Sequence, residues 1–181
     1  MDHVLTIYKN EIYNKYNVLV DETNETLKDL WEEDKKINVN VLIDCICLQM
    51  SIMETVGITF YAISMDDIYF TNGIFIMMGK TIKLDNETFT FLSPPLLDKK
   101  KYFYYPEFLT QKYLPCSFHK SVIYYSIGLI LLCILVGFPV LRGTDYFIND
   151  EPIFDAIEKT KGRKYYFLKR CFASNRELIF I

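Results

Sequence analysis

Residues 121–141 constrain this chain more than any other stretch, because they contain no charged residue while Lys120 and Arg142 flank them. About 20 consecutive apolar residues are enough for a helix that spans a bilayer. A helix that is apolar on all sides is equally typical of the buried centre of a helical domain. The class of protein therefore depends on which of these two structures the stretch adopts.

Several features of this stretch favour a buried helix. Its first third contains two serines and two tyrosines, which are polar for a helix that faces lipid. Gly137 and Pro139 interrupt its far end and leave about 15 strongly apolar residues, which is short for a bilayer. The two flanking cations give no difference in charge between the sides. We therefore predict a buried central helix over 121–141, and a protein with a single span at 121–141 is the alternative.

Composition narrows the possible classes further. The chain has 181 residues, of which 51% are hydrophobic and 16% aromatic, so it can form one domain with a sizeable core. The net charge is −3 and no basic stripe is present, which argues against nucleic acid binding. The five cysteines lie mostly in apolar runs without metal-site spacing and are typical of a reducing compartment. The N-terminal sequence lacks the pattern of a secretory signal, so we expect a cytoplasmic location.

Hydrophobic patterns predict both helices and strands. Residues 3–9 and 16–21 are predicted to be short strands, and Thr23 or Asn24 is predicted to cap the helix that follows. Residues 38–56 are predicted to form a long helix, largely buried because apolar residues occupy nearly every face. The last part of the chain is predicted to contain one or two further helices.

Glycine and turn residues divide the middle of the chain. Gly57 is well suited to end the long helix, because glycine adopts the left-handed conformation at little cost. The pair Asn72-Gly73 between aromatic and branched residues predicts a β-hairpin over 68–78. A second small pairing is expected between 81–84 and 88–92.

The order of these features resembles the C-terminal lobe of a protein kinase. The helix 38–56 resembles the helix that leads into a kinase catalytic loop. Tyr105-Pro106-Glu107 is similar to the Ala-Pro-Glu motif that ends the activation segment, and residues 125–128 (Tyr-Ser-Ile-Gly) are similar to the Trp-Ser-x-Gly that opens the central kinase helix. The segment 168–178, which contains Arg176, resembles the end of the kinase fold. The amino-acid sequences of these motifs are most similar to those of divergent kinase-like proteins of large DNA viruses.

The resemblance implies a fold and a domain arrangement. The expected fold is mainly α (α+β): a kinase-like C-lobe with a helical bundle around the buried helix 121–141 and small β-hairpins. The N-lobe is expected to be absent or reduced to two strands. Residues 1–181 would then form a single truncated domain, with an N-lobe remnant and hinge at 1–22 and the C-lobe at 23–181. The resemblance also implies a structural ion pair between Glu107 and Arg176.

Two alignments with the kinase catalytic loop are possible. The first places residues 60–62 (Phe-Tyr-Ala) at the His-Arg-Asp triplet, Asp67 at the metal-binding Asn, and Met78 near the magnesium Asp. It leaves no catalytic base, because an alanine side chain cannot accept a proton. We prefer this first register, since it keeps the exit of the long helix and the hairpin together.

The second register makes Asp67 the base, with Asn72 and Asp85 at kinase-like intervals behind it. It breaks the hairpin, because Asn72 then ends the catalytic loop instead of forming the turn. Neither register supplies a glycine-rich loop or an N-lobe lysine, both of which phosphoryl transfer by a kinase requires.

The resemblance therefore implies a catalytically degenerate kinase-like domain (a pseudokinase) that acts as a binding or scaffolding module. We expect no catalytic residue, metal or cofactor, and we expect another protein as the partner, with no nucleic acid and no membrane. The cytoplasm would be that of the host if the chain is viral. The enzymatic alternative is a divergent or fragmentary serine/threonine protein kinase that uses ATP and magnesium.

Overall fold

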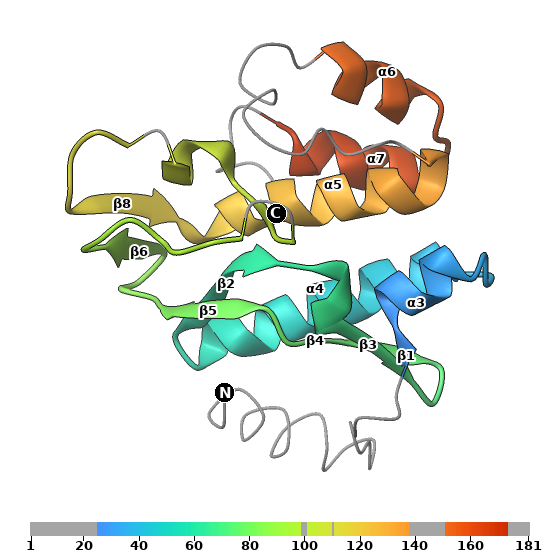
Figure 1. Cartoon of the computed structure of the whole chain (residues 1–181), viewed down its shortest axis with the longest axis horizontal. Coiled ribbons are helices and arrows are strands. Elements are labelled where there is room, and N and C mark those ends of the chain that lie inside the picture. Colours follow the sequence, from blue (N-terminus) through green and yellow to red (C-terminus); the bar gives the residue numbers. More distant parts are fainter. Residues whose placement is uncertain (1–24, 99–100, 110, 138–150, 174–181) are drawn as a thin grey trace.

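A computed structural model describes residues 25–98, 101–109, 111–137 and 151–173 (Figure 1). The two strands predicted at 3–9 and 16–21 lie outside these residues, as does the proposed N-lobe remnant at 1–22. The boundary at 22–23 therefore stays a prediction.

The described chain contains five α-helices, three 3₁₀ turns and eight strands. The α-helices are α3 (Leu27–Glu32), α4 (Val39–Thr55), α5 (Ile123–Val136), α6 (Glu151–Glu158) and α7 (Arg163–Cys171). The 3₁₀ turns are η2 (Met65–Asp67), η3 (Pro106–Leu109) and η4 (Lys120–Val122). The strands are β1 (Glu25–Thr26), β2 (Ile58–Ile63), β3 (Ile68–Thr71), β4 (Ile74–Met77), β5 (Lys80–Lys83), β6 (Thr88–Phe91), β7 (Phe103–Tyr104) and β8 (Cys116–His119).

The expected mainly α fold class is wrong, because the described chain is a mixed α+β structure. Its eight strands form three antiparallel sheets, with the strand orders β1-β3-β4, β5-β2-β7 and β6-β8. Strands β2, β3 and β4 are rich in Ile, Phe and Tyr, which favour strands, and apolar residues alternate with polar ones from Thr81 to Leu84 and in β6. The prediction limited these strands to small local hairpins, whereas most of them pair with distant segments.

Helix α4 forms as the sequence predicts. The Asn38 side chain accepts a hydrogen bond from the Val41 backbone N–H at 3.4 Å, which caps the first turn. Gly57 follows the last turn with φ +72°, in the left-handed region that favours glycine. The predicted bounds 38–56 are therefore confirmed to within one residue at each end.

The hairpin around Asn72-Gly73 is also confirmed. Strands β3 and β4 pair in antiparallel register, and both turn residues have positive φ, 50° and 82°. Positive φ at both central residues is what a tight hairpin turn of this kind requires. The second expected pairing is wrong, because β5 pairs with β2 and β6 pairs with β8.

Helix α5 lies at the centre of the described structure, with α4 and the strands β1 to β5 on one side and α6 and α7 on the other (Figure 1). The sheet β6-β8 lies beyond the N-terminal end of α5. Every residue from Ile123 to Cys133 is buried, which confirms the buried central helix. The helix is shorter than 121–141: it follows η4 and ends before Gly137, which has φ +59°. No helix in the described ranges has both the length and the apolar character needed to cross a membrane.

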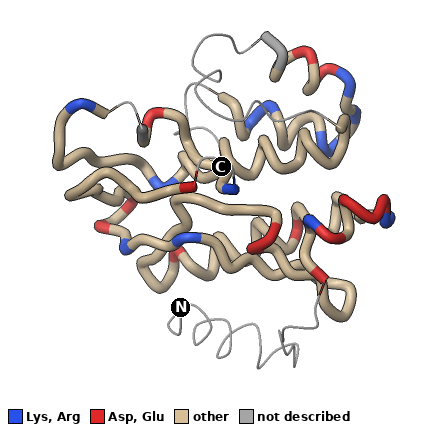
Figure 2. The backbone as a smooth tube through the Cα atoms, in the orientation of Figure 1, with Lys and Arg blue, Asp and Glu red and all other residues tan. Residues whose placement is uncertain are grey.

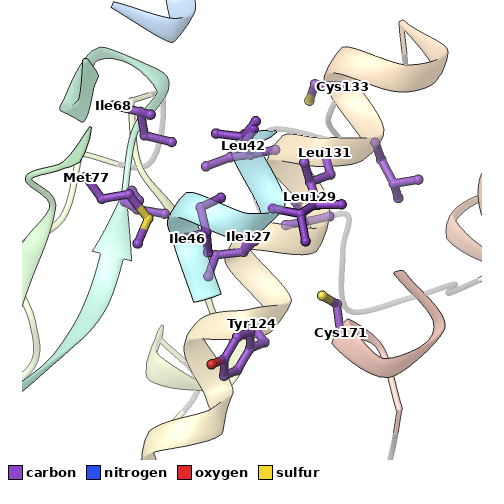
Figure 3. Close-up of a cluster of buried hydrophobic side chains, with 14 of the residues drawn as sticks. Leu42, Ile46, Ile68, Met77, Tyr124, Ile127, Leu129, Leu131, Cys133 and Cys171 are labelled. Carbon is purple, nitrogen blue, oxygen red and sulfur yellow. The ribbon is translucent and has the colours of Figure 1, made fainter. Parts of the chain in front are cut away.

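Both signs of charge occur on each side of α5 (Figure 2), so neither sign defines a face of the molecule. The interior between the helices is apolar. Side chains of α4, among them Leu42 and Ile46, lie close to Ile127 and Leu129 of α5, and Cys171 of α7 lies on the other side of α5 (Figure 3). This main core includes residues from every α-helix and connects α5 to the rest of the fold.

A second, smaller core lies beneath the two-stranded sheet β6-β8. We call it the phenylalanine core, and its buried members are Leu84, Phe89, Phe91, Phe108, Phe118 and Val122. The rings of Phe108 and Phe118 are 4.8 Å apart between centroids, and the pair is T-shaped. The Tyr105 ring packs against both cores, so it links the phenylalanine core to α5.

Removing the hydroxyl of Ser126 should stabilise the protein. Ser126 is fully buried in α5, and its Oγ has no hydrogen-bond partner among the described residues. Burying a hydroxyl without a partner costs free energy, and alanine also has the higher helix propensity. We expect Ser126→Ala to raise the free energy of unfolding by about 1 kcal/mol in urea titrations.

Ser51→Ala is the matched control, because Ser51 is an exposed helical serine in α4. It should gain only the difference in helix propensity, about 0.5 kcal/mol or less. If Ser126→Ala were less stable than the wild type, the Ser126 hydroxyl would have to form a hydrogen bond in the folded protein.

Candidate functional site

The candidate site lies at the end of β2, where the kinase resemblance places a catalytic loop. Ala62 of β2 is fully buried. It pairs with Lys80 of β5 on one side and with Tyr104 of β7 on the other. In the first register Ala62 occupies the position of the catalytic base, and its methyl group can neither accept nor donate a proton.

The structure places the segment that contains Met78 beside Ala62. Gly79 directly follows Met78, the residue that falls near the magnesium-binding Asp. A Cβ atom on Gly79 would lie 2.7 Å from the Ala62 carbonyl oxygen. The places that the resemblance assigns to the base and to the magnesium Asp are therefore close together, and both carry apolar residues, whereas Asp67 keeps a carboxylate at the position of the metal-binding Asn.

A cluster of charged side chains surrounds η2, which follows β2. The Lys28 Nζ lies 3.4 Å from the Asp66 Oδ1, and the Lys101 Nζ lies 3.8 Å from the Asp66 Oδ2. The ammonium groups of Lys80 and Lys101 lie 5.5 and 5.6 Å from the centre of the Tyr102 ring. We call Lys28, Asp66, Asp67, Lys80, Lys101 and Tyr102 the lysine–aspartate cluster.

Asp66 and Asp67 have local structural roles within this cluster. The Ser64 backbone N–H donates to the Asp67 Oδ2 at 3.2 Å, and the Asp66 N–H donates to the Ser64 Oγ at 3.1 Å. Together these bonds cap the short η2 turn. Burial raises the pKa of Asp67, and the positive charge of Lys101 opposes that rise. Asp67 therefore belongs to the framework of the turn.

The three residues of the second register are not gathered at one point. Asp67 ends η2, whereas Asn72 is exposed in the hairpin turn at the other end of β3. An extended strand rises about 3.3 Å per residue, so the Cα atoms of Asp67 and Asn72 are roughly 16 Å apart. Asp85 is exposed in a different turn, where its backbone pairs with Thr88. Residues that far apart cannot share one metal ion.

The donor atoms of the lysine–aspartate cluster do not suit magnesium. Its two carboxylates face three lysines, whereas magnesium needs oxygen ligands in a nearly octahedral arrangement. Within the described ranges, no group of three or more His, Cys, Asp or Glu side chains could hold a metal ion. The charged side chains around η2 instead pair with one another.

The environment of Glu107 differs from the expected one. Glu107 is exposed, and the Tyr105 hydroxyl donates a hydrogen bond to its Oε1. Burial therefore does not require Glu107 to pair with a cation, because an exposed carboxylate retains its contact with water. Arg176 lies outside the described residues, so the ion pair itself stays a prediction. If it forms, its value should be that of a surface pair, about 0–1 kcal/mol.

Gln49 was not identified from the sequence, although it positions one strand of the site. Its buried side chain lies on α4, where the Nε2 donates to the Phe75 carbonyl at 2.7 Å and the Oε1 accepts from the Met77 N–H at 2.8 Å. These two bonds hold the outer edge of β4 against α4. Because β4 leads directly into Met78 and Gly79, Gln49 fixes the approach of that segment to Ala62. The available signal in the sequence was an amide side chain in the apolar middle of the helix, since the other amide of α4, Asn40, lies in its first turn.

A second set of ion pairs was also missed. Lys120 lies 2.7 Å from Glu54 of α4 and 3.3 Å from Glu87 in the turn before β6. These carboxylates, Glu54 first, raise the pKa of Lys120. His119 is 3.6 Å from Glu87 and hydrogen-bonds to the Ser121 hydroxyl through its Nδ1 at 2.8 Å. The pairs connect α4 to the sheet β6-β8, and no local pattern in the sequence predicts them.

Comparisons with known proteins give no family. No protein-family model matches the chain, and no curated protein matches it significantly. The resemblance to kinases therefore rests on the residues and on the order of the elements.

Proposed function

We propose that this chain is a catalytically degenerate protein-kinase-like domain that acts as a binding module for another protein. The observation that carries the proposal is the contact between Ala62 and the Met78-Gly79 segment. In the preferred register these positions would hold the base and a metal ligand. With apolar residues at both places, the site lacks the base and the magnesium Asp. Asp67, at the position of the metal-binding Asn in this register, is then the one carboxylate left among these positions, and it caps the η2 turn.

The order of elements supports the kinase-like part of the proposal. A long helix, α4, leads through Gly57 into β2, and the hairpin β3-β4 follows. Strand β5 returns to pair with β2, and the buried helix α5 comes after the Pro-Glu segment. The proposed likeness to kinases is limited to the order of these elements around the site, and the fold as a whole is mixed α+β.

The proposed setting is the cytoplasm, which would be the host's if the chain is viral. Within the described residues the five cysteines form no disulfide, as suits a reducing compartment. A protein partner is favoured over nucleic acid, because the chain is acidic overall.

We predict that the chain transfers no phosphate. Incubation of the full chain with magnesium, labelled ATP and a general protein substrate should give no incorporation above a blank without protein. The physical reason is the absence of a proton acceptor at Ala62 and of a metal ligand at Met78. Asp67→Ala, assayed in parallel, should give the same blank value as the wild type.

The opposite outcome would be equally informative. Transfer by the wild type that Asp67→Ala abolishes would establish Asp67 as the base and would refute the proposed loss of catalysis.

A further inference from the structure

An exposed segment with two prolines follows β6. We call residues 92–97, Leu-Ser-Pro-Pro-Leu-Leu, the diproline segment. The exposed fractions of Leu92 and Leu96 are 82% and 95%, so neither side chain packs against the protein's own core. No charged residue occurs from Thr88 to Leu97, and the tube in Figure 2 is tan there. The segment therefore offers apolar side chains to the solvent and contains no charged residue, although Asp98 directly follows it.

Proline chemistry restricts the backbone of this segment. Each proline ring fixes its own φ near −65°, and a residue that precedes proline is kept out of the helical region. Ser93 and Pro94 both precede a proline, so their backbones are biased toward extended or polyproline II conformations. The chain bends at Leu92 and Ser93, and residues 94–98 have no bend, turn or regular secondary structure. Within the described part of the chain, residues 92–97 form no hydrogen bond, which is a property of a polyproline II segment.

The segment is also held at both ends. Phe91, immediately before it, is buried and pairs with Cys116 of β8. At its other end, the Asp98 carbonyl accepts hydrogen bonds from the backbone N–H groups of Lys101 and Tyr102, at 3.1 and 2.9 Å. A ligand that is already extended and anchored loses little conformational entropy on binding.

We propose that the diproline segment is a ligand for a partner protein that presents an aromatic-lined groove for polyproline II peptides. Such grooves bind exposed proline and aliphatic side chains on a preformed extended backbone. Addition of the segment as a strand to a partner's sheet fits less well, because Pro94 and Pro95 have no N–H to donate. The proposal goes beyond the loss of catalysis and holds whether or not the chain is kinase-like.

The test uses the full chain and three purified probes: an SH3 domain, a WW domain and an EVH1 domain. Each is titrated into the protein by isothermal calorimetry. One of them should bind saturably with one site per chain. The double variant Pro94→Ala/Pro95→Ala should weaken that binding about tenfold, because it frees the backbone and removes the ring contacts. Leu96→Ser should weaken it as well.

Leu48→Ser is the matched control, because Leu48 is a partly exposed leucine on α4, away from the segment. It should leave the affinity unchanged, and circular dichroism should show the same fold for every variant. The proposal is overturned if no probe binds, or if the double variant binds as tightly as the wild type. If no probe binds and Leu96→Ser abolishes a concentration-dependent self-association measured by light scattering, the segment makes contacts between copies of this chain, and the proposal is overturned in favour of that role. None of these outcomes affects the phosphate-transfer assay.

Discussion

Replacing Gln49 with Ala should lower the free energy of unfolding by about 3–5 kcal/mol. The Gln49 amide is 2% exposed and bonds to two backbone groups of β4, the Phe75 carbonyl and the Met77 N–H. Alanine would leave both groups buried without a partner and would also leave a cavity. Each unpaired buried group costs about 1–3 kcal/mol, and the cavity adds to this. Urea denaturation followed by circular dichroism measures the loss.

Gln111→Ala provides the comparison, since Gln111 is exposed in a loop and its change should stay within about 0.5 kcal/mol. If Gln49→Ala lost as little as Gln111→Ala, the backbone groups of β4 would have to find other partners, and α4 would not be holding this edge.

Replacing Gly79 with Ala should cost about 3 kcal/mol. The new Cβ would lie 2.7 Å from the Ala62 carbonyl oxygen and 3.3 Å from the Ile63 Cα. Both atoms belong to the backbone of β2, which is paired on both sides and cannot rotate away. The strain must therefore move β2 away from the segment that joins β4 to β5. The thermal midpoint and the urea midpoint should both fall.

Gly137→Ala separates this overlap from ordinary glycine strain. Gly137 has φ +59°, and a Cβ there would meet no atom within 4 Å. Its replacement should cost only the left-handed penalty, about 1 kcal/mol. A loss at Gly79 no larger than at Gly137 would show that Ala62 and Gly79 are not in contact, and the main support for the proposed function would be lost.

Local signals in the sequence were sufficient for the elements that depend on local interactions. Asn38 and Gly57 define both ends of α4, and Asn72-Gly73 defines the hairpin, because a cap or a turn involves only neighbouring residues. Helix α5 was recognised from its composition, and Gly137 was recognised as an interruption, although the predicted bounds 121–141 ran past it. The sequence identified where these elements occur and left their long-range partners open.

The sheets could not be predicted in the same way. Phe89 pairs with Phe118, and Thr59 of β2 pairs with Ile82 of β5. An alternating pattern shows that a segment is a strand, but the same pattern fits many partners. The local alternative, a pairing of 81–84 with 88–92, satisfied the pattern equally well and was wrong. The shift from mainly α to α+β follows from these distant pairings.

The candidate site was predicted only in part. The preferred register named Ala62 and Met78, and the structure places the segment that carries Met78 beside Ala62. The lysines that surround Asp66 come from α3 and from the segment before β7, which only the folded chain brings together. The role of Gln49 likewise depends on the position of β4 against α4.

The division of the interior into two cores has a consequence for motion. The phenylalanine core has six buried members, far fewer than the main core, and it lies beneath a sheet of only two strands. Parts of a protein with few buried contacts open locally at a lower free energy than the whole fold unfolds. Amide hydrogens of β6 and β8 should therefore exchange with solvent before those of α4 and α5. The diproline segment continues from β6, so a bound partner could pull on the part of the molecule that opens first while the main core stays closed.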